Sequence, residues 1–479
     1  MRRWIHPVAA LVLALAATAG GQPSLRTEAT EALRRATAFF RSEVSTQGGY
    51  LWRYSEDLAL REGERRATAT MAWVQPPGTP SVGMAYLEVY KATRDRDYLE
   101  AARQTALALV RGQLRSGGWD YLIEFDPALR HQYSYRVDPG SEKGRNVTTL
   151  DDDTTQAAVR LLVQVDQALE LREKEVHEAA LYALDSLLAA QYPNGAWPQR
   201  FDQFPDSAKF PVKPASYPQS WPRLHPGDEY RGHDTFNDGT IADTIATMLQ
   251  AARVYRRAAY RQAAEKAGGF ILLAQMPEPQ PAWAQQYDAQ MHPAWARRFE
   301  PPSVTGGESL GVMRSLLELY RETGSRKYLA PLPRAIAYLR RSRLSDGGLA
   351  RFYEMETNRP LYFTRDHKLT YAADDLPTHY VFKVRGAEEE LERIAREYER
   401  LSRMSPSQLR RAVGTASKPS EALEGSVREI IAALDSRGRW VEPGDLRTHE
   451  GSGTKRIITT ATFVRNVRVL TGYLRAQRN

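Results

Sequence analysis

Apolar residues recur at helical spacing through most of the chain. Residues 154–169, 241–255, 312–320 and 463–474 each show this spacing, which places the apolar side chains on one face of a helix. Runs in which apolar and polar residues alternate, as they do in half-buried strands, are few and short. The pattern therefore predicts an all-α fold.

A glycine-containing turn followed by an aromatic residue repeats between the predicted helices. Glycine ends each helix, and the aromatic ring packs against the next layer. Helix pairs repeated in this way form an open solenoid or a closed ring, and long, uneven loops favour the ring. The sequence thus predicts an α/α toroid of repeated helix pairs, with long loops on one face forming the active cleft. The copies lie at residues 47–52, 113–119 and 191–197, with weaker ones at 275–283, 344–352 and 437–440.

The first residues have the features of a signal peptide. Arg2 and Arg3 precede an apolar run at 8–17, and Ala-Thr-Ala at 17–19 offers the small residues of a cleavage site. We therefore expect residues 1–19 to be removed and the mature protein to be secreted or periplasmic. With no cysteine in the chain, it contains neither disulfides nor a thiolate nucleophile.

The remaining chain divides by composition into two parts. Residues 25–384 carry the repeated helix pairs and are predicted to form the catalytic toroid. The sequence becomes more charged from about residue 385, so we expect 385–479 to be a helical extension that packs on the toroid or completes it. No later segment is long and apolar enough to cross a membrane, and we expect the mature protein to act as a monomer away from the membrane.

The net charge of +8 is consistent with an anionic partner. Nucleic acid, membrane phosphate and an acidic glycan all have the required charge, but export and the lack of zinc-finger or RNP spacing argue against nucleic acid. Arginine-rich helices that simply carry solvated charge remain an alternative. Charge therefore favours an acidic glycan without deciding the question.

Two acidic segments each precede an apolar helix. Three successive aspartates occupy 151–153, and Asn237-Asp238 precedes the later helix. One interpretation is helix capping, with Asp153 and Gln156 forming a capping box and Asn237 or Asp238 capping the second helix. The other is a metal site, because both segments open on the same face of a toroid and adjacent carboxylates repel each other. Oxygen ligands without clustered His or Cys suit calcium or magnesium.

Arginine and aromatic residues are concentrated in segments with little helical periodicity. Segment 283–302 is rich in tryptophan, tyrosine and arginine, and segment 348–366 contains Arg351, Arg359 and Arg365. Arginine binds carboxylates bidentately, so these segments suit recognition of a uronic acid chain. The alternative for segment 348–366 is a structural cluster of salt bridges between its arginines and neighbouring acidic residues. The separate loop at 211–231 contains aromatic residues that suit stacking on sugars. The acidic partners would be Glu354, Glu356 and Asp366, and the loop aromatics are Tyr217, Trp221 and Tyr230.

Four short segments follow one another in a specific order. They read Gln-Tyr-Pro-Asn-Gly-Ala-Trp-Pro-Gln at 191–199, Thr-Phe-Asn-Asp at 235–238, Gln-Gln-Tyr-Asp with Pro-Ala-Trp-Ala-Arg at 285–297, and Arg-Phe-Tyr-Glu with Thr-Asn-Arg-Pro at 351–360. As a set, they resemble the family-10 pectate lyases, also called the pectic acid lyase family. The resemblance covers about residues 150–371. The chain departs from the family pattern where three aspartates directly abut Thr154.

This resemblance implies an α/α toroid that cleaves pectate, or polygalacturonate, by calcium-assisted β-elimination. It assigns Arg297 as the base that removes the C5 proton. Arginine is almost always protonated, so this role requires that calcium and neighbouring cations such as Arg298 depress its pKa strongly. The resemblance further implies calcium ligands and substrate-binding residues. The former are Asp151, Asp152 and Asp238, and the latter are Arg351, Arg365, Arg359, Trp197, Tyr287 and Asn237.

Three other functions share some of these features. The Gln-x-x-x-Gly-x-Trp spacing at 113–119 and 191–197 and the aspartate-rich segment also resemble terpene cyclases, although an export signal argues against an isoprenoid enzyme. An inverting glycoside hydrolase needs two opposed carboxylates, a role open to Asp152 and Asp238. A non-catalytic protein that binds acidic polysaccharides is the alternative that is not an enzyme.

Overall fold

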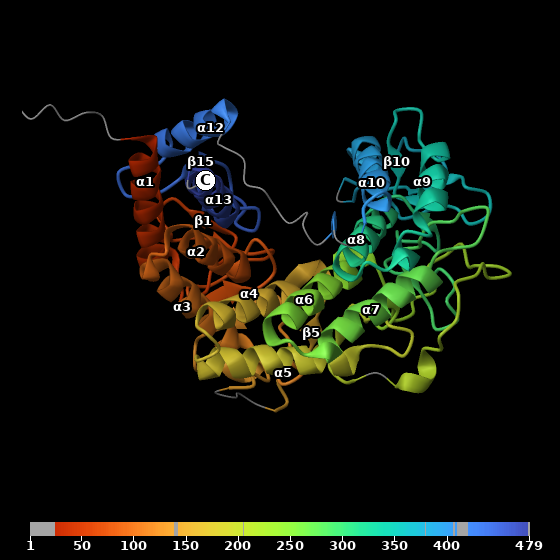
Figure 1. Cartoon of the computed structure of the whole chain (residues 1–479), viewed down its shortest axis with the longest axis horizontal. Coiled ribbons are helices and arrows are strands. Elements are labelled where there is room, and N and C mark those ends of the chain that lie inside the picture. Colours follow the sequence, from red (N-terminus) through yellow and green to blue (C-terminus); the bar gives the residue numbers. More distant parts are fainter. Residues whose placement is uncertain are drawn as a thin grey trace, which may run out of the picture.

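Helices arranged in an inner and an outer row form most of the molecule (Figure 1). The structure, a computed structural model, describes residues 24–137, 142–204, 206–378, 380–405, 408–409 and 420–477. The inner row contains helices that contact one another in succession, and each is followed in the chain by an outer helix. The inner helices are α2 (Thr79–Thr93), α4 (Thr154–Ala168), α6 (Thr240–Tyr255) and α8 (Gly307–Thr323), and the outer ones are α3 (Arg96–Gly112), α5 (Lys174–Ala190), α7 (Ala258–Leu273) and α9 (Leu332–Arg341).

The two ends of this arrangement are extended by the C-terminal part of the chain. Helix α10 (Ala387–Ser402) packs on α8 and α9, whereas α13 (Thr460–Ala476) packs on α2 at the other end. Helices α1 (Leu25–Phe39) and α12 (Glu421–Ala432) lie beside α13. The paired rows confirm the predicted α/α toroid class. In the described residues the ring is incomplete, with an opening between α10 and α12 (Figure 1).

The described part of residues 385–479 therefore contributes to both ends of the arc through α10, α12 and α13. The division of the chain near residue 385 stays a prediction, and the predicted signal peptide at 1–19 lies outside the described residues. Among the residues that the structure describes, no helix combines the length and apolarity needed to cross a membrane.

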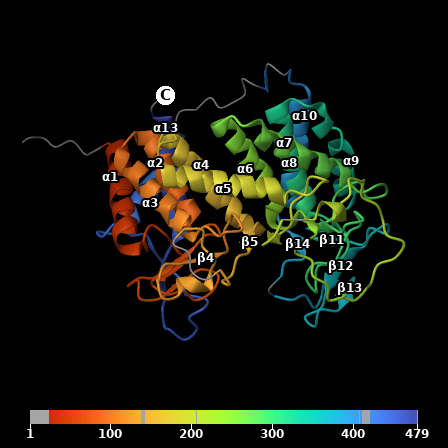
Figure 2. The same ribbon diagram turned by 90° about the horizontal axis from the view of Figure 1, so that it is seen from below.

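Short antiparallel strands gather at one end of the helices (Figure 2). One four-stranded sheet joins the N- and C-terminal parts, because Arg53 of β1 pairs with Thr459 of β16. Its order is β15 (Val441–Pro443), β16 (Arg456–Thr459), β1 (Arg53–Ser55) and β2 (Arg61–Glu62). The second has the order β13 (Leu369–Thr370), β12 (Pro360–Phe363), β11 (Phe352–Tyr353) and β9 (Val304–Thr305). The two-stranded pairs are β3 (Met71–Trp73) with β4 (Leu122–Glu124), β5 (Thr148–Thr149) with β6 (Arg200–Phe201), β7 (Asp234–Thr235) with β8 (Gln286–Tyr287), and β10 (Leu349–Ala350) with β14 (Lys383–Val384).

The glycine–aromatic repeat has a structural role in joining successive helix pairs. The Gln113 side-chain amide donates to Gly117 O within its turn and to Ala179 O of the next outer helix, each at 2.9 Å. The indole N–H of Trp119 donates to Leu109 O at 2.8 Å. The same bonds recur in later copies, where Gln191 binds Gly195 O and Ala263 O, Trp197 binds Leu187 O and Trp283 binds Ile271 O. The repeat thus satisfies buried polar groups between layers, which accounts for its likeness to the terpene cyclase pattern without isoprenoid chemistry.

Two hydrophobic cores support these layers. The larger core lies between the two helix rows and extends through all the helix pairs. The smaller one lies under β9, β11 and β12, and its buried residues are Trp295, Phe352, Leu361, Tyr362, Phe363 and Phe382. The smaller core supports the segment that contains Arg297.

Candidate active site

Two short 3₁₀ turns of nearly the same geometry precede α4 and α6. They span Asp151–Asp153 and Asn237–Gly239, and they lie against each other because α4 and α6 are adjacent. The middle residue of each turn, Asp152 or Asp238, has a positive φ, of 51° and 45° respectively. Aspartate tolerates this left-handed region better than most residues. Repetition of one turn on adjacent inner helices thus brings the two acidic segments together.

The turns form a compact acidic cluster. Carboxylate oxygens of Asp151, Asp152 and Asp238 all lie within 4.8 Å of one another. Asp153 is separate from this cluster, since its carboxylate forms an ion pair with Arg160. Of the three successive aspartates, Asp151 and Asp152 are therefore the two that lie together with Asp238.

The predicted helix caps are not formed. Residues Asp153 and Gly239 occupy the N-cap positions of α4 and α6, and neither helix has a side-chain cap. Gln156 instead donates to the carbonyl oxygen of Leu150 at 2.8 Å. The capping interpretation is therefore wrong, because the positive φ angles of the turns direct the carboxylates elsewhere.

Neighbouring side chains hold Asp151 and Asp152 in place. Asp151 accepts hydrogen bonds from the Tyr121 hydroxyl at 2.8 Å, from Gln199 Nε2 at 3.0 Å and from Arg200 Nη2 at 3.3 Å. Asp152 accepts one from Gln75 Nε2 at 2.9 Å. The sequence analysis missed these four partners as supporting residues, although Gln199 lies at the end of one of the family-like segments.

The acidic cluster has the electrostatic character of a cation site. Loss of hydration and the charges of Asp151 and Asp238 raise the pKa of Asp152 to about 7. Loss of hydration and the charge of Asp151 likewise raise the pKa of Asp238 to about 6. The Asp151 charge therefore opposes ionisation of Asp152 and Asp238, and a bound cation would relieve this repulsion.

The donor atoms fit a hard divalent cation such as calcium or magnesium. All three carboxylates supply hard oxygen ligands, which calcium and magnesium prefer. The side-chain oxygen Oδ1 of the adjacent Asn237 is buried and, within the described chain, makes no hydrogen bond. The Asn237 amide donates to Asp238 Oδ2 at 2.7 Å, so Asn237 directly supports the cluster.

Two arginine residues, Arg297 and Arg351, lie near the acidic cluster. Arg297 binds Glu300 bidentately, with Nε 2.9 Å from Oε2 and Nη2 2.6 Å from Oε1. Arg351 lies 3.2 Å from Glu308 Oε1. The charges of both arginines lower the pKa of Asp238, which shows that they act on the acidic cluster.

Tyr380 connects these two arginines. The centre of its ring is 5.3 Å from the Arg297 guanidinium carbon and 4.7 Å from that of Arg351. Its hydroxyl donates to Glu300 Oε1 at 2.9 Å. Sequence analysis did not single out Tyr380, which lies far along the chain, or Glu300, whose only signal was its place in the aromatic and basic segment at 283–302.

The structure does not depress the pKa of Arg297. Burial by itself lowers that pKa, but the hydrogen bonds and charge of Glu300 outweigh burial and raise it above its usual value. Arg298, the neighbouring cation named from the sequence, is exposed. The expected local depression of the pKa is thus absent in the described site, and a base role for Arg297 needs another source for the loss of its proton.

Two aromatic residues expected to contact substrate instead lie in the core. Trp197 and Tyr287 are both fully buried. The Trp197 indole is bonded to the backbone of α5, and the Tyr287 hydroxyl donates to Ala274 O at 2.6 Å. Their assignment to substrate binding from the family resemblance is wrong, because both side chains are buried and bonded to the backbone of the core.

Two arginines expected to bind substrate lie on the β12–β13 side of the second sheet. Arg365 is largely exposed and is 3.3 Å from Asp375, while Arg359 stacks on Tyr371 with its guanidinium carbon 3.5 Å from the ring centre. No described contact links either residue to the acidic cluster. The predicted salt-bridge alternative also differs from the structure, since Glu354 pairs with Arg223 of the 211–231 loop.

The long loop at 211–231 packs over the segment that carries Arg297. Trp295 donates its indole N–H to Pro222 O at 2.9 Å, and Trp221 lies 6.4 Å from Trp295 between ring centres. Tyr217 donates to Pro277 O. Tyr230 lies near the cleft, because Arg297, Glu300 and Asp151 all influence its pKa, which burial raises. Of the three loop aromatics, Tyr230 is thus the one placed to meet a ligand at the acidic cluster.

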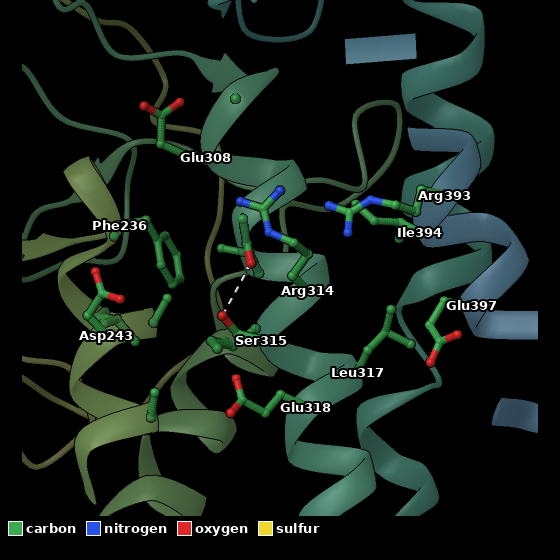
Figure 3. Close-up of a pocket in the computed structure, with 18 of the residues that line it drawn as sticks. Phe236, Asp243, Glu308, Arg314, Ser315, Leu317, Glu318, Arg393, Ile394 and Glu397 are labelled. Atoms are coloured by element: carbon green, nitrogen blue, oxygen red, sulfur yellow. Dashed lines mark hydrogen bonds between the residues drawn. The ribbon is translucent and has the colours of Figure 1, made fainter. Parts of the chain in front are cut away.

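A cavity of about 980 Å³ continues from the site along the inner helices. Asp238, Glu308 and Arg351 lie at one end, and the walls are formed by α6, α8 and α10. Figure 3 shows Asp243 on the α6 side, Arg314 on α8, and Arg393 extending from α10 toward α8. The site is therefore the end of a longer groove between helices.

Comparison with known proteins gives a sequence match over the part of the chain that carries this site. Residues 129–346 match the sequence model of the pectic acid lyases. None of the curated proteins matches the chain. Arg351 and the later arginines lie just beyond the matched residues, whereas the acidic cluster and Arg297 lie within them.

Several solved structures are similar at low sequence identity. The family 10 polysaccharide lyase from Cellvibrio cellulosa is 19% identical, with 67% of this chain and 97% of that chain covered and a TM-score of 0.47. A mutant of that lyase in complex with trigalacturonic acid gives the same identity and TM-score. Cellobiose 2-epimerase from Bacillus thermoamylovorans is 13% identical, with 95% of this chain and 99% of that chain covered and a TM-score of 0.48. Over residues 129–346, somewhat less than half of its length, the chain is thus similar in sequence to the pectic acid lyases, which are enzymes.

Proposed function

We propose that this enzyme cleaves pectate-type polysaccharides by β-elimination with the help of a bound calcium ion. The observation that carries the proposal is the cluster of Asp151, Asp152 and Asp238, with Arg297 and Arg351 near enough for their charges to act on Asp238. Such a site presents positive charge to a uronate carboxylate from the arginines and provides oxygen ligands for a cation. Because residues 129–346 match the pectic acid lyases in sequence, polygalacturonate is the substrate to test first.

The chemistry of a uronate explains why both kinds of group are needed. The C5 proton lies next to a carboxylate, and its removal places additional negative charge on that carboxylate. Groups that stabilise this charge where it develops lower the barrier. A calcium ion held by Asp151, Asp152 and Asp238 would supply Lewis-acid stabilisation of the carboxylate. Arg351, fixed by Glu308 and Tyr380, supplies a guanidinium for the same group.

Arg297 is the proposed group that removes the C5 proton. Its side chain is 43% exposed, so it remains accessible from the cleft while Glu300 fixes its orientation. Tyr380 and Phe299 lie beside the guanidinium, with ring centres 5.3 Å and 5.1 Å from its carbon. These contacts restrict the guanidinium to one position, which favours a defined approach to the sugar.

The test is a direct assay of lyase activity. Purified protein is incubated with polygalacturonate and calcium, and the ultraviolet absorbance of the unsaturated product is followed. We expect calcium-dependent absorbance that EDTA removes. New reducing ends without ultraviolet absorbance would instead indicate a hydrolase, and tight binding without either signal would indicate a binding protein.

Arg297→Ala tests the base, with Arg298→Ala as a matched control. Both variants remove one positive charge from the same segment, but Arg298 is exposed and forms no part of the Glu300 pair. We expect Arg297→Ala to abolish turnover while substrate binding persists, and Arg298→Ala to remain active. Near-normal turnover in Arg297→Ala would refute the assignment.

Export is the remaining part of the proposal and rests on the signal-like sequence at 1–19. When the full-length chain is expressed, we expect the mature protein in the periplasm or the medium, with an N-terminus that follows residue 19. N-terminal sequencing of the secreted protein checks this, and recovery of the intact chain from the cytoplasm alone would oppose it.

A further inference from the structure

The Arg297–Glu300 pair raises the question of where the proton of Arg297 goes. An arginine acts as a base only after it has become neutral, because a guanidinium has no lone pair to accept a proton. Glu300 is 2% exposed and accepts two side-chain hydrogen bonds from Arg297, one from the Arg297 backbone N–H at 3.0 Å and one from Tyr380. A buried carboxylate in direct contact with the guanidinium is the nearest available proton acceptor.

We propose that Glu300 accepts the proton that Arg297 must lose, so that the Arg297–Glu300 pair acts as one base. This proposal rests on the proposed lyase function and identifies a partner for its base. In the resting pair, Arg297 is positive and Glu300 is negative. Transfer of one proton within the pair gives a neutral guanidine and a neutral carboxylic acid, so no net charge is created in the cleft.

The proton and electron balance is complete with water as the only other participant. The neutral guanidine takes the C5 proton, and the C5–H electron pair forms the double bond to C4. The C4–O bond breaks, and the glycosidic oxygen leaves with its electron pair and takes a proton from water. Arg297 is again positive, and Glu300 returns the pair to its resting state by releasing its proton to water.

Burial by itself raises the pKa of Glu300, but the hydrogen bonds and charge of Arg297 outweigh burial and hold that pKa below its usual value in the open site. The exchange therefore depends on substrate covering the site. The groups that face Glu300 are Arg297, Tyr380, Arg351 and Tyr230. In the open site Arg297 is partly solvated, and this hydration stabilises the charged form of the pair. A sugar chain over Arg297 removes that water, which destabilises the ion pair relative to the neutral pair. The acceptor is thus activated by substrate binding.

Glu300→Gln tests the proposal because glutamine keeps the size of the side chain but cannot accept the proton. We expect kcat to fall by about a hundredfold or more, the usual contribution of general-base catalysis, with binding of a galacturonate oligomer little changed. Glu300→Asp restores a carboxylate and should recover part of the lost kcat. Equal losses in the two variants, or a loss that appears only in binding, would overturn the proposal.

Tyr380→Phe supplies a measurement that a merely structural role for Glu300 would not affect. Loss of the Tyr380 hydroxyl removes one hydrogen bond that stabilises the Glu300 carboxylate. At saturating calcium, the rising part of the kcat profile should then move to higher pH by about one unit, because Glu300 must be ionised to accept a proton. An unchanged profile would overturn the relay, whereas absence of lyase activity in the unmodified enzyme would refute the proposed function itself.

An independent inference comes from the groove between α8 and α10. Helix α10 lies beyond the family-matched residues, yet Arg393, Arg396 and Arg400 of this helix line the same cavity as Asp238 and Arg351. Arg393 and Arg400 are held by Glu390 and Glu397, which also bind Arg314 and Arg321 of α8. Among the residues described, Arg396 forms no ion pair with a protein carboxylate.

We infer that Arg396 binds a carboxylate of the acidic polysaccharide at a sugar distant from the cleavage site. The glutamate contacts fix the neighbouring arginines on the two walls, while Arg396 presents an exposed guanidinium to the cavity. Guanidinium and carboxylate groups match in geometry and charge. This inference also rests on the proposed function, because it extends the same ligand along the groove.

Oligogalacturonates of increasing length test this extension. In Arg396→Ala, we expect KM to rise by about five- to tenfold for long oligomers, with kcat unchanged and with the shortest cleaved oligomer unaffected. Arg403→Ala is the matched control, since Arg403 follows α10 and does not line the cavity. A KM unaffected at every length, or equally raised by both variants, would overturn the inference, while wild-type inactivity on all lengths would refute the lyase proposal.

Discussion

Replacement of Asp152 by asparagine distinguishes a metal site from an ordinary group of surface carboxylates. At a metal site, the substitution changes the stability of the cation-free and cation-bound protein in opposite directions. Without a cation, Asp152 is repelled by Asp151 and Asp238, and the substitution removes this repulsion. With calcium, the substitution removes one of three negatively charged ligands. We therefore expect Asp152→Asn to stabilise the protein in EDTA and to weaken its stabilisation by calcium.

The magnitude follows from the pKa of Asp152, which rises from 3.8 to about 7. A difference of one pKa unit corresponds to about 1.4 kcal/mol, so the upper limit is about 4 kcal/mol. Solvent screens this partly exposed cluster, and about 2 kcal/mol is a reasonable expectation. Because the pKa is raised in the folded state, the wild type loses stability as pH rises from about 4 to about 7. The gain in Asp152→Asn should be absent near pH 4 and complete above pH 7.

The assay is urea unfolding at several pH values, in EDTA and with increasing calcium. Stabilisation by a ligand grows as its concentration exceeds Kd, reaching about 2.7 kcal/mol at a hundredfold excess. Asp152→Asn should shift this dependence to at least about tenfold higher calcium, since ligand charge sets the affinity. Asp153→Asn is the control, because it removes the adjacent carboxylate that binds Arg160 and leaves the cluster intact.

Two outcomes would refute the reasoning about the cluster. One is a loss of stability in EDTA for Asp152→Asn. The other is an unchanged calcium dependence in Asp152→Asn. Either result would show that Asp152 is held by ordinary contacts, and the calcium assignment would then need other ligands.

Three further predictions concern the core and the surface. Trp197→Ala should lower the free energy of unfolding by about 3–5 kcal/mol, because it removes a fully buried side chain, and urea unfolding measures this loss; a stable variant with weak substrate binding would contradict the core assignment. Arg351→Ala should reduce kcat/KM by about a hundredfold, whereas Arg365→Ala, on an exposed pair with Asp375, should leave it within about threefold; steady-state assays compare them, and equal losses would refute the placement. Asp234 is fully buried, and burial raises its pKa to about 8. The wild type should therefore lose stability as pH rises from about 4 to 8, whereas Asp234→Asn should not. Parallel curves of unfolding free energy against pH for the two proteins would contradict this.

The fold and the site differ in how far the sequence predicted them. Helical periodicity and the glycine–aromatic repeat were sufficient to predict the paired rows, because each depends on local spacing. The same repeat misled the assignment of Trp197, since a conspicuous aromatic at regular spacing serves packing as readily as binding. Burial decides between these roles, and it is set by neighbouring layers that the local sequence does not reveal.

For the acidic cluster, in contrast to Trp197, the sequence predicted correctly which residues lie together. Two acidic segments before successive helices predicted that Asp151, Asp152 and Asp238 lie together, and the structure brings their oxygens within 4.8 Å. The competing interpretation of helix capping failed because of positive φ angles at Asp152 and Asp238, which the residue types permit but do not require. The metal itself stays a prediction, to be tested by calcium binding.

The sequence by itself determined the helical repeat, the family segment and the position of the carboxylates before α4 and α6. Only the tertiary structure decided the surroundings of the arginines, because Glu300 and Tyr380 meet Arg297 from positions 3 and 83 residues later in the chain. It also separated Arg351 from Arg365, which are close in sequence but lie in different environments. Electrostatic effects depend on distance and hydration in space, so the pKa of Arg297 is set by the fold that packs these segments together.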